Sequence, residues 1–423
     1  MPNRLAPGCG CDAPQSGGSP IGIDAALARI VAHVAPLART EEIALADAPG
    51  RILAEPVHVR HMSPPFDNAA MDGYAVATGA LRGEGPWTLA VAERVAAGQA
   101  ADRPLAGASA VRIFTGAPVP AGADAVVMQE AVLREGGSIR LDQRPEPGLN
   151  IRAAGSDLAA GQIALEAGWR LGPRQIAACA AAGAARLTVR QRLRVGLLVT
   201  GDEVRQTGGA RAAAEIWDIN TPMLAAALCS PAITLVTCAQ GADSRDALQA
   251  QLADLAGQVD LLVTTGGLSV GEEDHVKPAL DALGAELFFS GVAMKPGKPV
   301  SFGRVAGAAW LGLPGNPLSA LVTWHLFGTA LVARLTGQQQ PAATRRHVVT
   351  TGAIRRRPGR CELRPARLTG FDAQGRELAS FEAGLHSGRV GGLPMADGLM
   401  FLPAEADHLP AGALVEFQPF QDI

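Results

Sequence analysis

The segment VDLLVTTGGLSVGEEDHVK, residues 259–277, joins an apolar run of β type to a loop rich in hydroxyl groups and glycine. The run ends in Thr264-Thr265-Gly266-Gly267, and the acidic sequence Gly271-Glu272-Glu273-Asp274 follows shortly after. A strand that leads into such a loop leaves backbone N–H groups free to bind an oxyanion. Carboxylates there would repel the anion unless a hard cation such as Mg²⁺ lay between them. A tight turn before a solvated acidic helix start is the simpler alternative.

The sequence around this segment alternates apolar strands with amphipathic helices, which indicates a largely parallel sheet covered on both faces. The predicted elements are strands at 195–199, 233–238 and 261–264, and helices at 221–229 and 244–255. Ligands of such sheets bind beyond the carboxyl ends of the strands. Three ends carry unusual residues: Thr200-Gly201-Asp202-Glu203, the segment quoted above, and Pro314-Gly315-Asn316-Pro317-Leu318-Ser319. We predict that they share one pocket, although three independent turns would use the same residue types.

A loop with two lysines, Met294-Lys295-Pro296-Gly297-Lys298-Pro299, lies between the second and third of these ends. Its prolines prevent a regular helix, so both ammonium groups can lean toward one oxyanion. The loop is no Walker A motif, because five residues separate Gly291 from Gly297 and proline stands where serine or threonine would bind the metal. A solvated surface loop is the alternative.

The remaining sequence predicts one helix and two β-rich blocks. A helix is expected at 23–37 with Asp24 as N-cap. Short runs separated by Gly, Pro and Asp turns predict a mostly β block between 51 and 149, and a small β barrel or sandwich from about 341. In the first block, Asp72-Gly73 favours a hairpin turn that places Tyr74 in the core.

Composition limits the class of protein. The chain has 423 residues, of which 48% are hydrophobic and 18% charged, so we expect a folded soluble protein of two to four domains. Its formal net charge of −3 gives no reason to expect nucleic acid as a partner. The apolar run 318–335 is a little short for a membrane span, and we expect a buried helix.

The N-terminal twenty residues lack the apolar core of a signal peptide and are expected to form a flexible tail. Six cysteines in so long a chain form no disulfide framework, which favours a cytoplasmic location. Cys9 and Cys11 form an isolated C-x-C pair with no second pair at the spacing of zinc ligands.

Seven motifs, taken in order, resemble those of the molybdopterin molybdenumtransferases of the MoeA type. They are PPFDNAAMDGYAV, RIFTGAPVPAGADAVVMQE, NIRAAGSDL, LLVTGDE, VTTGGLSVGEEDHVK, MKPGKPVSFG and LGLPGNPLSALV. The resemblance runs from about residue 21 to the C-terminus. It implies a transferase that inserts molybdate into the dithiolene of adenylylated molybdopterin with Mg²⁺, and that releases AMP and the molybdenum cofactor.

The resemblance also implies roles for individual residues. Asp274 and Glu203 would serve the metal and phosphate end, with Asp243 as a further metal ligand. Lys295 and Lys298 would hold the anion, and Ser269 and Ser319 would supply hydroxyl groups near it. The substrate-binding set continues with Arg152, Thr200, Gly266, Gly267, Pro314, Gly315 and Asn316. Asp72 and Thr115 complete the catalytic set with Glu203 and Asp274.

The implied architecture has a tail (1–20), a discontinuous linking domain (21–55 with 150–190), a β-rich insertion domain (56–149), an α/β domain like that of molybdopterin adenylyltransferase (191–336) and a C-terminal β-barrel domain (341–423). In this family a homodimer completes each cleft, with Asp72, Thr115 and Arg152 facing the α/β block of the other subunit. Contacts with molybdopterin adenylyltransferase and with maturation factors of molybdoenzymes are implied, and partners such as nucleic acid or membrane are not.

Three positions depart from the family pattern. Gly291 and Ala153-Ala154 stand where basic residues are common, and His275 stands where tyrosine is common. The first two departures lower the positive charge near the expected cleft. Two other functions are kept as alternatives: pterin adenylylation, since the α/β block resembles that enzyme, and a non-catalytic pterin-binding scaffold.

Overall fold

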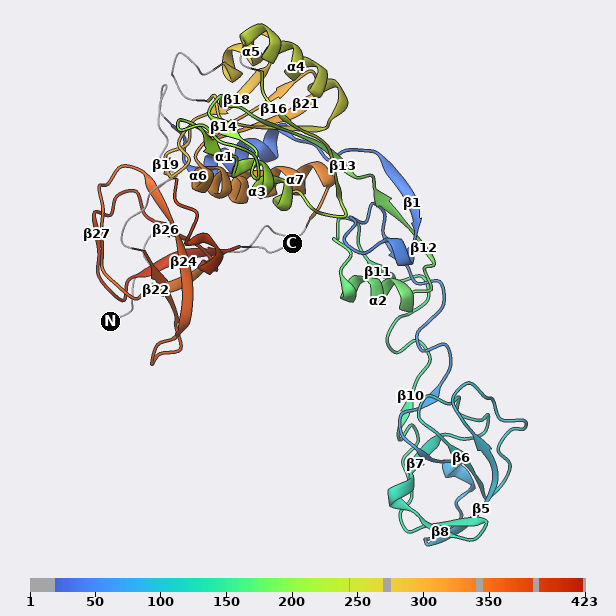
Figure 1. The fold of residues 1–423 in the computed structure, drawn as a ribbon. Coiled ribbons are helices and arrows are strands. Elements are labelled where there is room, and N and C mark those ends of the chain that lie inside the picture. The colour runs from blue at the N-terminus through green and yellow to red at the C-terminus, as the bar shows by residue number, and fades with distance from the viewer. Residues whose placement is uncertain (1–19, 243, 269–274, 340–344, 383–387, 421–423) are drawn as a thin grey trace.

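The computed structural model of the chain describes residues 20–242, 244–268, 275–339, 345–382 and 388–420. Figure 1 shows an elongated molecule, in which a β-rich block lies at one end and an α/β block with an adjoining barrel lies at the other. A small linking block lies between them. The tail that holds Cys9 and Cys11 is outside the described residues.

A mixed six-stranded sheet forms the centre of the α/β block, in which five strands run in one direction and β20 runs in the opposite one. In spatial order the strands are β16 (Ile233–Gln240), β13 (Leu193–Val199), β17 (Leu261–Thr265), β21 (Ala308–Leu313), β20 (Ser301–Val305) and β18 (Glu286–Ser290). Every residue of β17 and β21 is buried. Both faces of these central strands are covered, and their sequences are therefore continuously apolar.

Helices cover both faces of this sheet, as the apolar strands predict. Leu197 packs into one core cluster and its neighbour Leu198 into another, because successive side chains of a strand point to opposite faces. The first face is covered by α1 (Ile23–His33), α3 (Asn220–Ala227), α6 (Pro317–Thr323) and α7 (Thr329–Thr336). The second is covered by α4 (Arg245–Gln258) and α5 (Val276–Ala282).

One continuous helical run among the described residues, Pro317–Thr336, is long and apolar enough to cross a membrane by length and composition. It comprises α6, a π-helical turn at Trp324–Gly328, and α7. Its side chains Leu318, Phe327 and Leu331 belong to the core of the α/β block. The expectation of a buried helix is confirmed.

Helix α1 begins at Ile23 as predicted, but its N-cap and its C-terminal end differ from the prediction. Gly22 is the N-cap, and Asp24 lies in the first turn, where its Oδ1 accepts a hydrogen bond of 3.1 Å from Arg345. The predicted role of Asp24 as N-cap is therefore wrong. The helix ends at His33 because the next residues approach Pro36, before which helical backbone is disfavoured. The helix packs on the α/β core, although the resemblance assigns it to the linking domain.

The β-rich block is built on a six-stranded sheet. Its spatial order is β7 (Ala125–Met128), β4 (Gly73–Val76), β6 (Ser109–Ile113), β5 (Trp87–Val95), β9 (Ser138–Leu141) and β8 (Leu133–Glu135). Tyr74 is buried as predicted, but the hairpin at Asp72-Gly73 is wrong. Strand β3 (Asn68–Ala69), which precedes the turn, pairs with β10 (Ile151–Arg152), whereas β4 pairs with β6 and β7. A Cβ atom at Gly73 would lie 2.0 Å from the Val127 carbonyl oxygen, so close strand packing requires this glycine.

The linking block joins chain segments that lie on either side of the β-rich block in the sequence. Strand β1 (Thr40–Ala44) pairs with β12 (Arg186–Arg190), and β2 (Val57–His58) pairs with β11 (Ile163–Leu165). Helix α2 (Pro173–Ala181) packs beside them. The shared core of the two segments fixes where the β-rich block leaves the rest of the chain.

The C-terminal block is a closed five-stranded barrel, which confirms one of the two predicted forms. Its strands follow the order β24 (Cys361–Phe371), β25 (Glu377–Phe381), β22 (Arg346–Thr350), β28 (Leu414–Pro419) and β26 (Gly398–Leu402), and β26 pairs again with β24. Strand β19 (Met294–Lys295), from the lysine loop, adds to the edge of β24. The lysine loop is therefore attached to the barrel.

Candidate functional site

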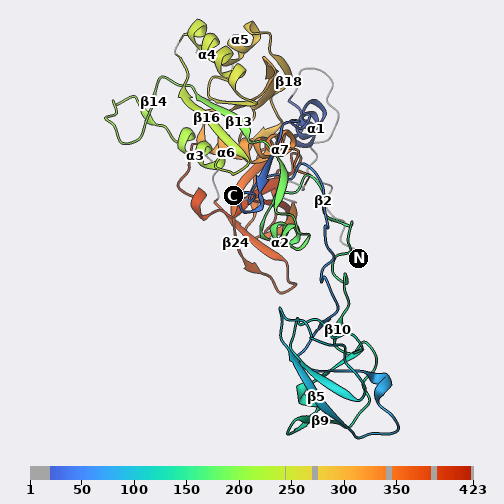
Figure 2. The same cartoon turned by 90° about the vertical axis from the view of Figure 1, so that its right-hand side faces the viewer.

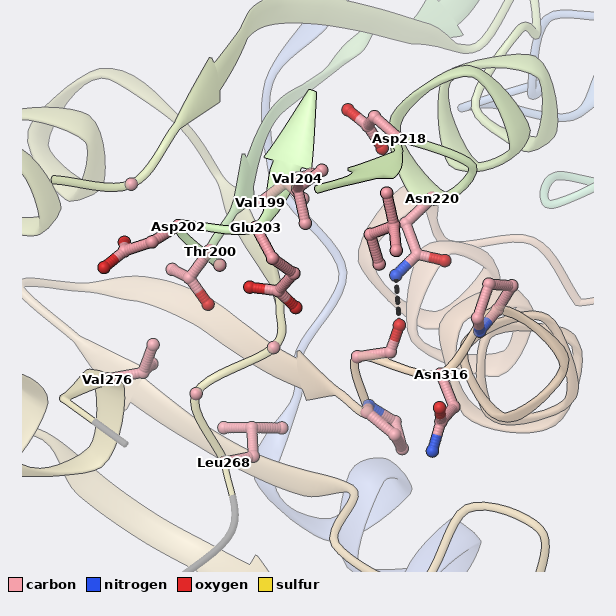
Figure 3. A pocket seen from close by; sticks show the side chains of 18 of the residues that line it. Val199, Thr200, Asp202, Glu203, Val204, Asp218, Asn220, Leu268, Val276 and Asn316 are labelled. Atoms are coloured by element: carbon pink, nitrogen blue, oxygen red, sulfur yellow. Dashed lines mark hydrogen bonds between the residues drawn. The ribbon is translucent and has the colours of Figure 1, made fainter. Parts of the chain in front are cut away.

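One cavity of about 1000 Å³ lies at the carboxyl ends of β13, β17 and β21. All three predicted strand ends line it, so the prediction of a shared pocket is confirmed (Figure 3). The three ends contribute Thr200, Gly201, Asp202 and Glu203, then Gly266, Gly267 and Leu268, and then Pro314, Gly315 and Asn316. Parallel strands bring these loops together because their carboxyl ends share one edge of the sheet.

The Gly266-Gly267 turn packs too closely against its neighbours to carry side chains. The φ angles of the two residues are 91° and 61°, a region that favours glycine. A Cβ atom at Gly266 would lie 2.6 Å from the carbonyl and hydroxyl oxygens of Thr200. The backbone N–H of Gly266 donates to the Leu313 oxygen at 3.1 Å, so the prediction of free N–H groups is wrong at this residue.

A buried amide connects the second and third strand ends. Asn220, at the start of α3, donates from Nδ2 to Thr265 Oγ1 at 3.1 Å and to the Gly315 oxygen at 2.7 Å. The Thr265 hydroxyl donates in turn to the Pro314 oxygen at 2.9 Å. Asn220 Oδ1 is buried and has no hydrogen-bond partner in the described part of the chain.

Asn220 was not predicted from the sequence, nor was Asp218, although both line the cavity. Asp218 Oδ1 accepts the N–H of Thr221 at 2.9 Å and so satisfies a free donor in the first turn of α3. The available signal was Asp218-Ile219-Asn220 directly before a predicted helix. A capping motif before a helix is common, and nothing local in the sequence distinguishes it from a site residue.

Three carboxylates, those of Asp202, Glu203 and Asp218, line the cavity (Figure 3). Among the described residues, no group of three or more His, Cys, Asp or Glu side chains is arranged to hold a metal ion. Of the three predicted metal ligands, Glu203 is described, whereas Asp243 and Asp274 lie outside the described residues. Ser269 also lies outside them.

The structure places Lys295 on the strand that adds to the barrel, and neither of the two predicted lysines is among the residues that line the cavity. Lys298 is exposed and precedes Pro299, which does line it. Lys295 Nζ lies 3.8 Å from Glu362 Oε2 on β24. The backbone conformation also explains why residue 291 is glycine and not a basic residue, since its φ of 88° is unfavourable for a residue with a side chain.

Glu362 belongs to a cluster of charged groups at the edge of the barrel. Arg364 Nε donates to its Oε1 at 2.7 Å, and Arg356 Nε donates to its Oε2 at 3.4 Å. Burial alone would raise the pKa of Glu362. Hydrogen bonding to Arg364 and the charges of Arg364, Lys295 and Arg356 outweigh burial and lower that pKa below its usual value. Lys295 therefore faces an ionised carboxylate.

Two more predicted residues occupy different positions relative to the cavity. Ser319 is buried within α6, one turn beyond Asn316, and does not line the cavity. His275 lines it near the start of α5.

In the β-rich block, the structure brings Asp72 and Thr115 together. Asp72 Oδ1 accepts hydrogen bonds from Thr115 N at 2.8 Å and from Thr115 Oγ1 at 2.7 Å. The backbone N–H of Thr115, then its hydroxyl, lower the pKa of Asp72 below the ordinary value, and the charge of Arg112 adds to this effect. Arg152 is exposed on β10. This block lies far from the cavity of its own chain (Figure 1), so one chain does not join these residues to the strand ends.

Three family profiles match the chain in succession. The MoeA N-terminal region (domain I and II) matches residues 21–183, a probable molybdopterin binding domain matches 196–334, and the MoeA C-terminal region (domain IV) matches 347–420. Together they span all the described blocks.

Curated relatives and solved structures agree with these profiles. The chain is 35% identical over 398 residues to molybdopterin molybdenumtransferase 2 of Mycobacterium tuberculosis, covering 92% of this chain and 97% of the relative. It is 39% identical over 303 residues to the Haemophilus influenzae molybdopterin molybdenumtransferase, covering 71% and 74%. A molybdopterin biosynthesis MoeA protein structure from Pyrococcus horikoshii superposes with a TM-score of 0.81 at 25% identity, covering 95% of this chain and all of that one.

Proposed function

Because the chain belongs to the MoeA family of molybdopterin molybdenumtransferases, which are transferases of molybdenum cofactor biosynthesis, we propose a specific reaction for it. The substrate is adenylylated molybdopterin, molybdate supplies the metal that enters the dithiolene, and AMP is released. The observation that carries this proposal is the cavity of about 1000 Å³ at three strand ends, which acidic side chains line together with the Gly266-Gly267 turn.

The donor set of the cavity suits Mg²⁺ as the cation. Mg²⁺ prefers oxygen ligands and is commonly held by one or two carboxylates together with substrate phosphates and water. Glu203 would hold the ion, joined by Asp274 and Asp243, which are assigned by family resemblance. When bound, the ion would neutralise charge that develops on the pyrophosphate oxygens.

The chain's own residues would orient the substrate. The 1000 Å³ cavity can hold a large ligand. The hydrogen bonds from Asn220 to Thr265 and from Thr265 to Pro314 hold the second and third strand ends, which line the cavity, in a fixed relative position. Lys295 and Lys298 remain the proposed partners of molybdate. For Lys295 this role requires the anion to compete with Glu362.

We also propose that Asp72, Thr115 and Arg152 complete the cleft of a second chain in a two-fold dimer. In support, the hydrogen-bonded pair of Asp72 and Thr115 lies at the far end of the molecule from its own cavity (Figure 1). Thr115 is exposed and Asp72 is partly exposed, so both groups are accessible to a second chain.

The reaction is tested by measuring AMP release from adenylylated molybdopterin with and without molybdate and Mg²⁺. We expect release only when both are present. The Glu203→Gln variant should weaken the apparent Mg²⁺ affinity, measured by calorimetry in the presence of AMP, by at least about tenfold.

Asp246→Asn is the matched control, because Asp246 lies in the first turn of α4 and does not line the cavity. Binding of the substrate without molybdate-dependent AMP release would refute the enzymatic proposal and favour a scaffold. Formation of adenylylated product from ATP and free molybdopterin would favour the adenylyltransferase alternative.

A further inference from the structure

An exposed tryptophan lies on the wall of the cavity. Trp217 and its neighbour Ile216 form the short strand β15, which pairs in parallel with β14 (Val204–Arg205), and both side chains line the cavity. Their exposed fractions are 38% and 52%. Within the described residues, neither side chain belongs to a buried hydrophobic cluster.

Polar contacts, and not burial of this indole, hold the segment in place. The segment from 204 to 217 projects from the α/β block beside β14 (Figure 2). Arg205 Nε lies 2.8 Å from Glu215 Oε1, and Glu215 Oε2 accepts the N–H of Ala212 at 2.7 Å. Arg211 also donates to the Glu215 carbonyl oxygen. Within the described residues, the Trp217 ring contacts the Arg211 guanidinium of the same segment and fills no buried core.

The surroundings of the ring favour a particular ligand chemistry. The Arg211 guanidinium lies over the ring, 5.6 Å from its centroid, and gives the aromatic wall a positive charge. The carboxylates of Glu203 and Asp218 lie elsewhere in the same cavity. An aromatic face beside a guanidinium fits a planar nitrogen heterocycle that carries a phosphate, because bases stack on aromatic side chains and phosphates pair with arginine.

We propose that Trp217 is a substrate-positioning residue that stacks on a heterocycle of the adenylylated pterin, with Arg211 beside the attached phosphate. This inference rests on the proposed function and deepens it. The substrate carries two such rings, the purine of its adenylate and the pterin, and the stacking chemistry is common to both. Stacking at the cavity wall would retain the substrate in the cavity that Glu203 also lines.

The test compares Trp217→Ala with Trp217→Phe, using AMP and free molybdopterin as separate ligands in calorimetric titrations. We expect Trp217→Ala to weaken binding of one of the two ligands by about tenfold, whereas Trp217→Phe stays within about threefold of the natural protein. The ligand that loses affinity identifies the stacked ring. In the steady-state assay the KM of Trp217→Ala should rise while kcat changes little, because stacking binds substrate and transition state alike.

Trp169→Ala is the matched control, since Trp169 is 37% exposed and does not line the cavity. It should leave both affinities and the KM unchanged. Thermal melting should show all three variants folded, because none removes a buried side chain. Unchanged affinity for both ligands together with an unchanged KM in Trp217→Ala would overturn the stacking proposal and leave the proposed reaction standing. A natural protein that releases no AMP would instead overturn the reaction itself.

Discussion

The strand-end cavity of the α/β block and the Asp72–Thr115 pair of the β-rich block both combine acids and hydroxyl groups beside glycine turns. They differ in how much of a site each one encloses. Three loops surround the cavity, whereas the pair lies on an exposed surface. The difference indicates that the first region can hold a ligand by itself, while the second contributes groups to something that approaches it. In the proposed two-fold dimer, the two regions would be unequal halves of one site.

Mixed dimers offer the largest test of this comparison. Glu203→Gln and Asp72→Asn proteins should each lose most of their activity when measured alone. If the two halves come from different chains, remixing the variants after dissociation should restore about a quarter of the natural activity, since half of the dimers are mixed and each has one intact cleft. The measurement is molybdate-dependent AMP release after remixing.

Remixing Glu203→Gln with itself is the control. Activity that stays at the level of the separate variants, in dimers shown to have exchanged subunits, would contradict a shared cleft.

Glycine substitutions compare the packing of the two regions. Gly266→Ala places a Cβ atom 2.6 Å from Thr200 at a φ of 91°, and we expect it to lower the free energy of unfolding by about 3–5 kcal/mol. Gly116 also has a positive φ, of 81°, but the nearest atom to its Cβ would be 3.9 Å away. Gly116→Ala should therefore lower the free energy of unfolding by only about 1–2 kcal/mol.

Urea denaturation measures both effects. Equal losses in the two variants would show that the Gly266 turn is less tightly packed than its contacts indicate.

Buried amides give a third comparison between the regions. Asn220→Ala removes hydrogen bonds to Thr265 and Gly315 and leaves the Gly315 oxygen without this donor, so we expect a loss of about 1–3 kcal/mol in the free energy of unfolding. Asn68, in the β-rich block, is similarly buried, but within the described residues its side chain donates a single long hydrogen bond, of 3.4 Å, to the Phe66 oxygen. Asn68→Ala should therefore have the smaller effect, and the reverse order would contradict the connecting role of Asn220.

The smallest expected effect concerns the titration of Asp72. Its depressed pKa keeps the carboxylate ionised to lower pH than usual, so a function that needs the anion is lost only as the pH falls through that depressed value. Thr115→Ala removes the hydroxyl donor but keeps the backbone N–H. The pKa should move part of the way back up, and the acid limb of the activity profile should shift to higher pH.

Carbon NMR titration of Asp72 reports this shift directly. Thr115→Ser retains a hydroxyl and serves as the control, so an identical titration in the alanine and serine variants would show that the hydroxyl has no influence.

Short sequence patterns were sufficient to predict many of the strands and helices. Continuous apolar runs identified β13, β17 and β16, and α4 begins one residue after its predicted start, with Ser244 as N-cap and its Oγ accepting the N–H of Ala247. These features were readable because apolar runs and caps are encoded within a few neighbouring residues. The partner of strand β4 was not readable, because Asp72-Gly73 resembles a hairpin turn while the strands that pair with β4 are distant in the sequence.

The sequence by itself determined the α/β and β blocks, the three strand ends and the family motifs, since each depends on residues that are close along the chain. The tertiary structure alone decided which groups meet. Asn220 bonds to a loop 95 positions away, and Lys295 lies opposite Glu362 on the barrel. Asp72 and Thr115 pair with each other far from the cavity of their own chain. Such contacts depend on how distant parts of the chain pack together, so no short stretch of sequence predicts them.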